Sequence, residues 1–337
     1  MMRAVVCDAP GKLTLAERPH PARRAGEALI RIRRVGICGT DYHIFRGTQP
    51  YLHYPRVMGH ELAAEVLEAP PQAGLAPGTI VCVIPYLSCG TCRACRRGRQ
   101  NCCSNLQVLG VHRDGGLTEH LSVPFSSLVD ATGLTVEQAA MVEFLAIGHH
   151  AVDRAGIRPG DRVLVVGAGP IGMAVTLFAS RLGSNVTVLD GNAHRTRFCI
   201  DALGGSLAVG LDGKPDTRLA EISADEGFDV VFDATGNPQA MEAGFSRVAH
   251  GGTYVLVSVV SASLTFDDPA FHKREMTLKG SRNATRGDFL AVIDAIRAGE
   301  VPTAAMHTHG ATLEDLPDRF DEWMEPAAGV IKAIVTV

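Results

Sequence analysis

The chain has 337 residues, a length that favours two domains over a single small core. Its net charge of -4 arises from interspersed acidic and basic residues, which argues against nucleic acid or an anionic membrane surface as the main partner. No apolar run reaches the roughly 18 residues that span a bilayer, and the N-terminus indicates a strand and a turn rather than a signal peptide. We therefore expect a cytoplasmic protein that acts on a small molecule.

The first part of the chain alternates short β-type runs with proline and glycine. Runs such as Glu27 to Val35 predict a β-rich domain over residues 1–148, whose loops can carry a site. Two of these loops together hold a thiol, an imidazole and two carboxylates, at Cys38, Asp41, His60 and Glu61. Such ligands suit zinc, and a catalytic zinc uses three protein ligands and keeps one position open.

Five of the nine cysteines lie between Cys89 and Cys103. In a reducing compartment this clustering favours metal binding over disulfides. The spacing C-x2-C-x2-C-x7-C lets four thiolates surround zinc with no open position, so we predict a structural zinc lobe over residues 86–105, held by Cys89, Cys92, Cys95 and Cys103. An iron–sulfur cluster is the chemical alternative, although the fourth cysteine lacks the C-x3-C-P setting. The neighbouring Cys102 could replace Cys103, and only the family resemblance given below favours Cys103.

A different pattern begins near residue 149. A buried strand is predicted at Arg162 to Val166, and a helix at Met173 to Leu182. Between them stand Gly167, Gly169, Pro170, Ile171 and Gly172, which form a G-x-G-x-x-G motif. Its glycines allow a pyrophosphate to approach the amides at the helix N-terminus. Further strands at Asn185 to Leu189, Val230 to Asp233 and Thr253 to Val259 complete an open parallel α/β sheet over residues 149–278.

Asp190 follows the second of these strands, 21 residues after Gly169. Its carboxylate can accept hydrogen bonds from the adenosine ribose and would repel a 2′-phosphate, which favours NAD over NADP. Arg195 and Arg197 favour NADP instead, because their positive charges could tolerate that phosphate. We also assign Arg195 and Thr235 to the cofactor site.

The last part of the chain, residues 279–337, returns to mixed patterns, with a helix around Phe289 to Ala298 and a final strand at Lys332 to Val337. Cys7, Cys82 and Cys199 stand in apolar surroundings and are expected to be core thiols. Because the last part of the chain returns to mixed patterns, the α/β domain is predicted to be inserted within the β-rich domain.

These motifs, together with Gly59-His60-Glu61 and Cys38-Gly39-Thr40-Asp41, resemble the zinc-dependent medium-chain alcohol dehydrogenases over essentially the whole chain. The segments Gly110 to Gly116 and Gly280 to Thr285 are similar to the polyol and sugar-acid branch of that family. The resemblance implies a GroES-like catalytic domain with an inserted Rossmann doubly wound parallel sheet. It also implies a homodimer or homotetramer and the NAD-dependent oxidation of an alcohol.

Roles follow from the resemblance, residue by residue. Cys38, His60 and Glu143 match the catalytic zinc ligands, and Glu61 can bind the zinc directly or through water, so the two carboxylates can exchange. Thr40 matches the hydroxyl beside the substrate oxygen, His43 the outer end of a proton relay, and Asp41 a supporting carboxylate. The sequence departs from the polyol-type pattern at Phe144, where proline is frequent.

Zinc would act as a Lewis acid that lowers the pKa of the substrate hydroxyl, so that hydride can pass to the nicotinamide. Arg113, Arg282 and Asn283 are candidates for binding the substrate, because an arginine can clamp a sugar-acid carboxylate with two hydrogen bonds. Solvated loop arginines are the simpler interpretation. The alternatives to a polyol or sugar-acid dehydrogenase are a threonine- or simple-alcohol-type enzyme and a non-catalytic NAD-binding sensor.

Overall fold

The computed structural model describes all 337 residues, which form two compact units. One contains residues Met1–Phe144 and Ala284–Val337, and the other contains Leu145–Asn283. The first division falls inside α4 (Val142–Ala155), not after residue 148 as the change of pattern suggested. A helix that continues through a domain boundary carries no turn signal there, so the sequence does not mark the position. None of the helices has both the length and the apolar character needed to cross a bilayer.

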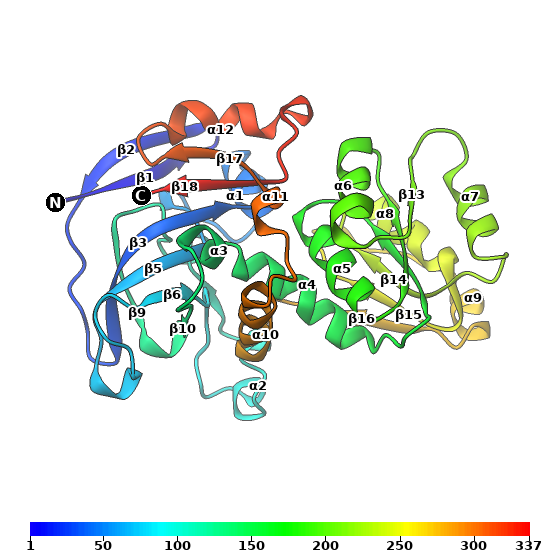
Figure 1. Cartoon of the computed structure of the whole chain (residues 1–337), viewed down its shortest axis with the longest axis horizontal. Coiled ribbons are helices and arrows are strands. Elements are labelled where there is room, and N and C mark those ends of the chain that lie inside the picture. Colours follow the sequence, from blue (N-terminus) through cyan, green and yellow to red (C-terminus); the bar gives the residue numbers. More distant parts are fainter. The chain divides into compact units, whose positions relative to one another are not determined.

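The first unit is rich in β-structure, as predicted. Its larger sheet has the order β10-β6-β5-β3-β18-β17, and β9 also pairs with β3. Figure 1 shows the final strand, in red, lying along the blue strand β3. The sheet therefore brings the C-terminal segment beside the loops that follow β3 and precede β5. Its strands are β3 (Glu27–Ile37), β5 (Glu61–Glu68), β6 (Ile80–Val83), β9 (His120–Pro124), β10 (Leu128–Asp130), β17 (His307–Thr312) and β18 (Lys332–Thr336).

A smaller antiparallel sheet joins β1 (Met2–Ala9), β2 (Lys12–Arg18) and β4 (Arg56–Val57). The apolar faces of both sheets enclose one core, which also buries α12 (Leu316–Met324) through Phe320 and Trp323. The ring of Phe320 lies 5.1 Å from that of Phe45 and 5.3 Å from that of Tyr42. These contacts fix α1 (Gly39–Phe45), the short helix that carries several of the candidate site residues.

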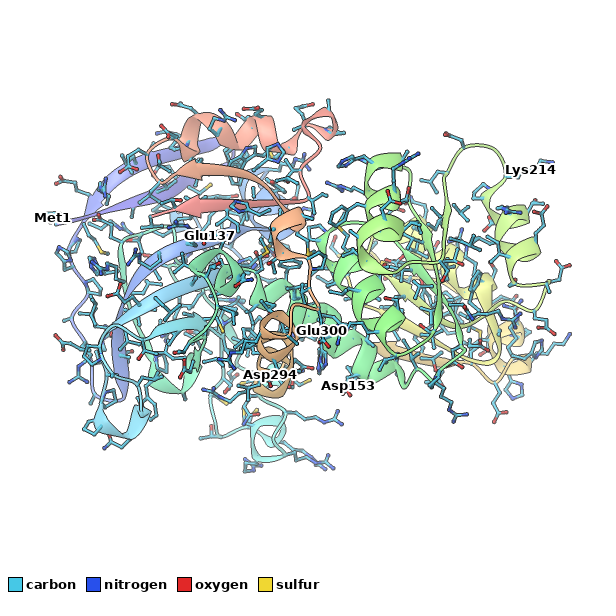
Figure 2. The ribbon with its side chains drawn as sticks, in the orientation of Figure 1. Met1, Glu137, Asp153, Lys214, Asp294 and Glu300 are labelled. Carbon is cyan, nitrogen blue, oxygen red and sulfur yellow. The ribbon has the colours of Figure 1, made fainter.

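Two further helices attach to the larger sheet. The helix α3 (Val136–Ala140) begins with a capping box between Thr135 and Gln138, and its Glu137, labelled in Figure 2, accepts a hydrogen bond from Arg34 on β3 at 2.9 Å. The helix α10 (Arg286–Arg297) is tied to β10 because Arg286 donates to the carbonyl of Leu128 at 2.6 Å.

The second unit is a six-stranded parallel sheet with the order β13-β12-β11-β14-β15-β16. Numbered along the chain this is 3-2-1-4-5-6, the doubly wound order, so the predicted Rossmann architecture is confirmed. The strands are β11 (Arg162–Val166), β12 (Asn185–Leu189), β13 (Leu207–Val209), β14 (Phe228–Asp233), β15 (Val248–Leu256) and β16 (Thr277–Gly280). Because β16 pairs with β15, a boundary after residue 278 would cut the sixth strand.

The connecting helices include α5, α6, α7, α8 and α9, and Figure 1 shows α5 and α6 beside one another. The helix α5 (Pro170–Arg181) starts three residues before the predicted Met173. Proline is favoured in a first helical turn, where its missing N–H costs no hydrogen bond. The others are α6 (Ala193–Leu203), α7 (Pro215–Ile222), α8 (Pro238–Gly244) and α9 (Asp268–Lys273).

Candidate zinc and cofactor sites

Cys38 is the N-cap of α1. Its Sγ accepts a hydrogen bond from the backbone N–H of Thr40 at 3.2 Å, while Asp41 Oδ2 accepts from the N–H of Cys38 at 3.0 Å. This is a capping box in which a thiol takes the usual place of a hydroxyl. The capping position fixes the direction in which the sulfur atom of Cys38 points.

His60 stands between Cys38 and Asp41. Its Nε2 lies 3.0 Å from Cys38 Sγ, and its Nδ1 lies 3.9 Å from Asp41 Oδ1. A metal shared with Cys38 would therefore bind Nε2, and Asp41 would support the opposite side of the ring. Burial acts to lower the pKa of His60, but the charges of Cys38 and Asp41 outweigh it and raise that pKa well above its usual value. The same negative charges attract a metal cation.

The loop from Gly110 to Gly116 packs against the backbone that leads to His60. A Cβ at Gly115 would come within 2.2 Å of the Gly59 carbonyl oxygen, so only glycine allows this approach. In the same loop, Asp114 Oδ1 accepts hydrogen bonds from the N–H of Val57 at 3.2 Å and from Arg56 at 3.1 Å. The segment that resembles the sugar-acid branch therefore holds the histidine loop in place.

Glu143 lies in the first turn of α4 and is 3% exposed. Its carboxylate, that of Glu61 and the ring of His60 offer metal-ligand atoms within 4.8 Å of one another, as do Cys38, Asp41 and His60. The hydroxyl of Tyr86, on β7 (Tyr86–Leu87), donates to Glu143 Oε1. Burial, opposed by His60, raises the pKa of Glu143 to about 7.

Glu61 is fully buried and forms an ion pair with Lys332, whose Nζ lies 2.6 Å from Oε1 and 2.5 Å from Oε2. The sequence analysis missed both Lys332 and Tyr86. The only sequence signal for Lys332 was its position within the apolar run Ile331 to Val335. A lysine in such a run is expected to be buried, and a buried lysine is almost always paired.

Thr40 and His43 also lie on α1. Thr40 is half-buried, and His43 is exposed with its Nδ1 3.0 Å from the hydroxyl oxygen of Thr48. That hydroxyl also donates to the carbonyl of His43 at 3.3 Å, so Thr48 contacts both the ring and the backbone of His43.

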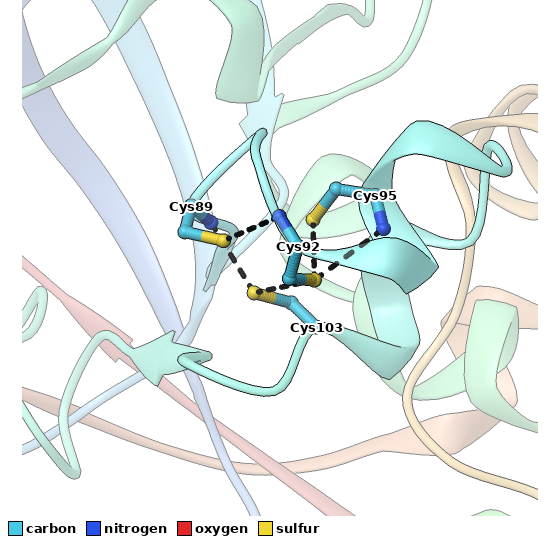
Figure 3. A group of neighbouring side chains, drawn as sticks. All are labelled: Cys89, Cys92, Cys95 and Cys103. Carbon is cyan, nitrogen blue, oxygen red and sulfur yellow. Dashed lines mark hydrogen bonds between the residues drawn. The ribbon is translucent and has the colours of Figure 1, made fainter.

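The four predicted cysteines of the lobe converge, as Figure 3 shows. Cys92 Sγ lies 3.4 Å from Cys95 Sγ and 3.9 Å from Cys103 Sγ. Hydrogen bonds from Thr91 lower the pKa of Cys89 to about 7, and the backbone N–H groups of Cys95 and Ser104 lower the pKa of Cys92 to about 5. Cys102 is exposed and does not belong to the group. The donor set fits a tetrahedral zinc.

The core thiols behave as expected. Cys7, Cys82 and Cys199 are buried, and burial raises their pKa values, to about 11, about 12 and about 12 respectively. They contribute packing and take no part in either group of metal ligands.

The second unit leaves open space at the start of α5. Gly169 is the N-cap, and a Cβ there would meet nothing within 4 Å. Asp190, at the end of β12, accepts hydrogen bonds from the N–H of Ala168 at 2.6 Å and of Asn192 at 2.7 Å. A carboxylate has about four acceptor positions, so Asp190 can still bind ribose hydroxyls. The open glycine and this carboxylate fit a dinucleotide.

Thr235 is beside the same turn. Its N–H and hydroxyl both donate to Asp233 Oδ1, at 3.0 and 2.9 Å, and a Cβ at Gly167 would come within 3.1 Å of Thr235 Cγ2. Arg195 is half-buried on α6. Asp233 is fully buried and was not predicted as a site residue.

The three candidate substrate residues belong to different units. Arg113 lies in the β-rich unit, is exposed, and donates from Nε to the side chain of Gln107. Arg282 is exposed and Asn283 half-buried, both in the parallel-sheet unit, and Asn283 has a positive φ of 55°.

A β-rich unit with groups of candidate zinc ligands and a Rossmann unit with an open glycine turn are the features of a zinc-dependent dehydrogenase. Two family models match the chain accordingly: the alcohol dehydrogenase GroES-like domain over residues 24–133, and the zinc-binding dehydrogenase over residues 170–298. The chain belongs to the zinc-dependent medium-chain alcohol dehydrogenase family. It is therefore an oxidoreductase that acts on a CH–OH group.

Similar proteins extend over the whole chain. L-galactonate-5-dehydrogenase of Escherichia coli K12 is 40% identical, with 99% of each chain covered. The NADH complex of the alcohol dehydrogenase RspB from Escherichia coli CFT073 is 26% identical with a TM-score of 0.92, covering 100% of this chain and 99% of that one. A zinc-binding dehydrogenase of Sinorhizobium meliloti 1021 with bound NADP is 28% identical with a TM-score of 0.90 and the same coverage.

Proposed function

We propose that this enzyme transfers a hydride from a secondary alcohol of a sugar acid or polyol to NAD, in a reversible reaction. The observation that carries the proposal is that His60 lies in one group of candidate metal ligands with Cys38 and in another with Glu143, in a chain 40% identical to an L-galactonate-5-dehydrogenase. Sequence identity of this level over the full length is a stronger argument for a related substrate than a shared fold alone.

Cys38, His60 and Glu143 would hold the catalytic zinc, and Cys89, Cys92, Cys95 and Cys103 the structural zinc. The catalytic ion supplies Lewis acidity at the substrate hydroxyl. Thr40 accepts the hydroxyl proton, which a threonine can do because its oxygen both donates and accepts. His43, which is exposed and whose Nδ1 lies 3.0 Å from the Thr48 hydroxyl oxygen, would be the outer end of the proton relay, where a proton is released to water.

NAD is proposed over NADP because of Asp190. Its carboxylate already accepts two backbone N–H groups beside the glycine turn, so it is held where it meets the adenosine ribose. A 2′-phosphate there would be repelled. Gly167, Gly169, Pro170, Ile171 and Gly172 would bind the pyrophosphate, while Arg195 and Thr235 contact the cofactor nearby.

Arg113, Arg282 and Asn283 are proposed to recognise the substrate. A sugar acid carries a carboxylate, which a guanidinium binds with two parallel hydrogen bonds. A threonine-type or simple-alcohol-type enzyme is the alternative within the family, and a non-catalytic NAD-binding sensor is the alternative outside it. The buried zinc ligands favour an enzyme over a sensor.

We further propose that the enzyme acts in the cytoplasm as a homodimer or homotetramer. All nine cysteines are free, as is expected in a reducing compartment. Symmetric homo-oligomers are the commonest assemblies of soluble enzymes. Light scattering would measure the oligomeric state.

The test is a substrate panel. The zinc-loaded protein is mixed with NAD and, separately, with aldonates, polyols, threonine and simple alcohols, and NADH is followed by absorbance. The highest kcat/KM is expected for an aldonate or polyol. Turnover of threonine or a simple alcohol alone would overturn the substrate assignment. No turnover, with only about one zinc per chain, would favour the sensor.

A further inference from the structure

The cysteine lobe carries a basic surface. Four arginines lie on and beside α2 (Arg93–Arg96). All four are exposed, and together they form the arginine surface: Arg93, Arg96, Arg97 and Arg99. No aspartate or glutamate occurs from Ser88 to Gln107, so the lobe has no acidic side chain to neutralise them. Four thiolates around one zinc ion carry two negative charges, which would balance only two of the four arginines.

An acidic surface lies at the opposite end of the same unit. The segment from Glu314 to Glu325 includes α12 and contains six acidic residues and one arginine. The helix buries Phe320 and Trp323 in the core, so its charged residues cover the outer face. The acidic surface consists of six exposed residues: Glu314, Asp315, Asp318, Asp321, Glu322 and Glu325. Figure 1 shows α12 and α2 at opposite ends of the β-rich unit.

Pairing within the chain neutralises only part of the acidic surface. Arg319 pairs with Glu322 at 3.0 Å, and Glu314 pairs with an arginine of β1. Asp318 and Asp321 remain three residues apart on the same helix, a spacing at which like charges repel each other. The arginines at the two ends of α2 have the same spacing. Each surface therefore carries a repulsion that contact with the other surface would relieve.

We propose that the arginine surface of one subunit binds the acidic surface of a second copy of this chain, and the reverse. Because the two surfaces lie at opposite ends of one unit, two copies related by a two-fold axis can form both contacts at once. Complementary charges of this kind fix which surfaces meet and in which orientation. The inference rests on the homo-oligomer of the proposed function and assigns the surfaces that join its subunits.

The charge of the whole chain favours this partner over a nucleic acid. The chain has a net charge of -4, and the acidic surface belongs to the same unit as the lobe, so a polyanion would be repelled by most of the molecule. A second copy presents to the lobe a compact group of carboxylates instead. It also receives the arginines of the other subunit on its own acidic surface, which a nucleic acid cannot do.

Exchange of the charges tests the contact. The lobe variant makes the arginine surface acidic through three substitutions: Arg93→Glu, Arg97→Glu and Arg99→Glu. The helix variant makes the acidic surface basic through three others: Asp318→Lys, Asp321→Lys and Glu325→Lys. Each variant alone then carries like charges on both surfaces. Sedimentation velocity is expected to show self-association weakened about tenfold or more in each of them.

A mixture of the two variants is the decisive sample. In the mixed pair the acidic lobe of one subunit meets the basic helix of the other, and the remaining two surfaces are complementary as well. The mixture is therefore expected to recover the association of the wild type. If it does not, α12 is not the partner of the lobe, and the inference is wrong whether or not the lobe binds a polyanion.

The wild-type protein provides a test that needs no variant to fold. Raising the NaCl concentration from roughly 50 to roughly 500 mM should weaken its self-association, because salt screens exposed charges. An oligomer whose mass is the same at both concentrations would overturn the assignment of these surfaces. Native mass spectrometry confirms that each variant keeps its lobe zinc. Since none of the six substituted residues belongs to a proposed site, kcat/KM should be unchanged, so a wrong substrate class and a wrong interface are distinguishable.

Discussion

Gly172 packs so closely on Gly167 that a Cβ at residue 172 would lie 1.8 Å from the Gly167 carbonyl oxygen. At Gly169, in the same turn, a Cβ would meet nothing within 4 Å. The two glycines therefore have different tasks. One permits the helix to approach the strand, and the other leaves room for a ligand.

Alanine substitutions separate these tasks. Gly172→Ala is expected to destabilise the fold by about 1–3 kcal/mol, because an atom is forced into a packed contact. Gly169→Ala should leave stability nearly unchanged and raise the KM for NAD, since its methyl group would occupy the space of the pyrophosphate. Urea unfolding and steady-state kinetics measure the two effects. Equal loss of stability in both variants would contradict the assignment.

Asp190→Asn is expected to reduce the preference for NAD over NADP by about 10- to 100-fold, because a charge-assisted hydrogen bond to the ribose is weakened and the repulsion of a 2′-phosphate is removed. The ratio of kcat/KM for the two cofactors measures this preference. Asp161→Asn is the matched control, since it removes the same charge from the turn before β11. If Asp190→Asn kept the full preference for NAD over NADP, the proposed contact between Asp190 and the adenosine ribose would be wrong.

The two adjacent cysteines of the lobe should differ. Cys103 is buried within the four-thiol group and Cys102 is exposed outside it. Cys103→Ser is therefore expected to lose the structural zinc, and Cys102→Ser to retain it. Native mass spectrometry counts the bound ions. Retention of the lobe metal by Cys103→Ser would show that another residue completes the site.

Cys38→Ala is expected to lose the catalytic zinc, keep the structural one, and reduce kcat by roughly 10³-fold, since metal Lewis acidity contributes several kcal/mol. Cys82→Ala is the control, because that thiol is buried in the same unit away from both groups. Elemental analysis gives the zinc content. Full activity in Cys38→Ala would exclude the proposed ligand set.

His120 should make stability fall in mild acid. Burial, together with the charges of His20 and Arg31, lowers its pKa below the usual 6.5, and Glu119 opposes this only in part. As the pH falls below 6.5, the unfolded chain takes up a proton before the folded protein does, so stability declines. We expect His120→Gln to flatten the fall in Tm between about pH 7 and 5.5, and the exposed His53→Gln not to. Parallel Tm curves for His120→Gln and the wild type would contradict this.

Local patterns predicted much of the molecule. The strands Arg162–Val166 and Asn185–Leu189 match the structure residue for residue, because buried parallel strands are continuous apolar runs that end at glycine or aspartate. The cysteine lobe and the glycine turn were likewise predicted from spacing. Their members lie within a few residues of each other, so the backbone between them restricts their geometry.

Boundaries were less predictable. The helix α4 contains the proposed zinc ligand Glu143 and continues past the division between the units, and β16 extends to Gly280, so both divisions fall where the local pattern does not change. Tertiary pairing decides where a sheet ends. A strand of four residues contains too few residues to show a recognisable hydrophobic pattern by itself.

The amino-acid pattern was sufficient to predict the family, the zinc chemistry and the candidate ligands Cys38 and His60, because each belongs to a short motif. The partners of the two carboxylates were not in any motif. Lys332 is 271 residues from Glu61, and Tyr86 is 57 residues from Glu143. Sheet pairing and core packing bring them together, and burial then makes an unpaired charge too costly to leave. The folded arrangement, not the order of residues, therefore distinguishes one glutamate from the other.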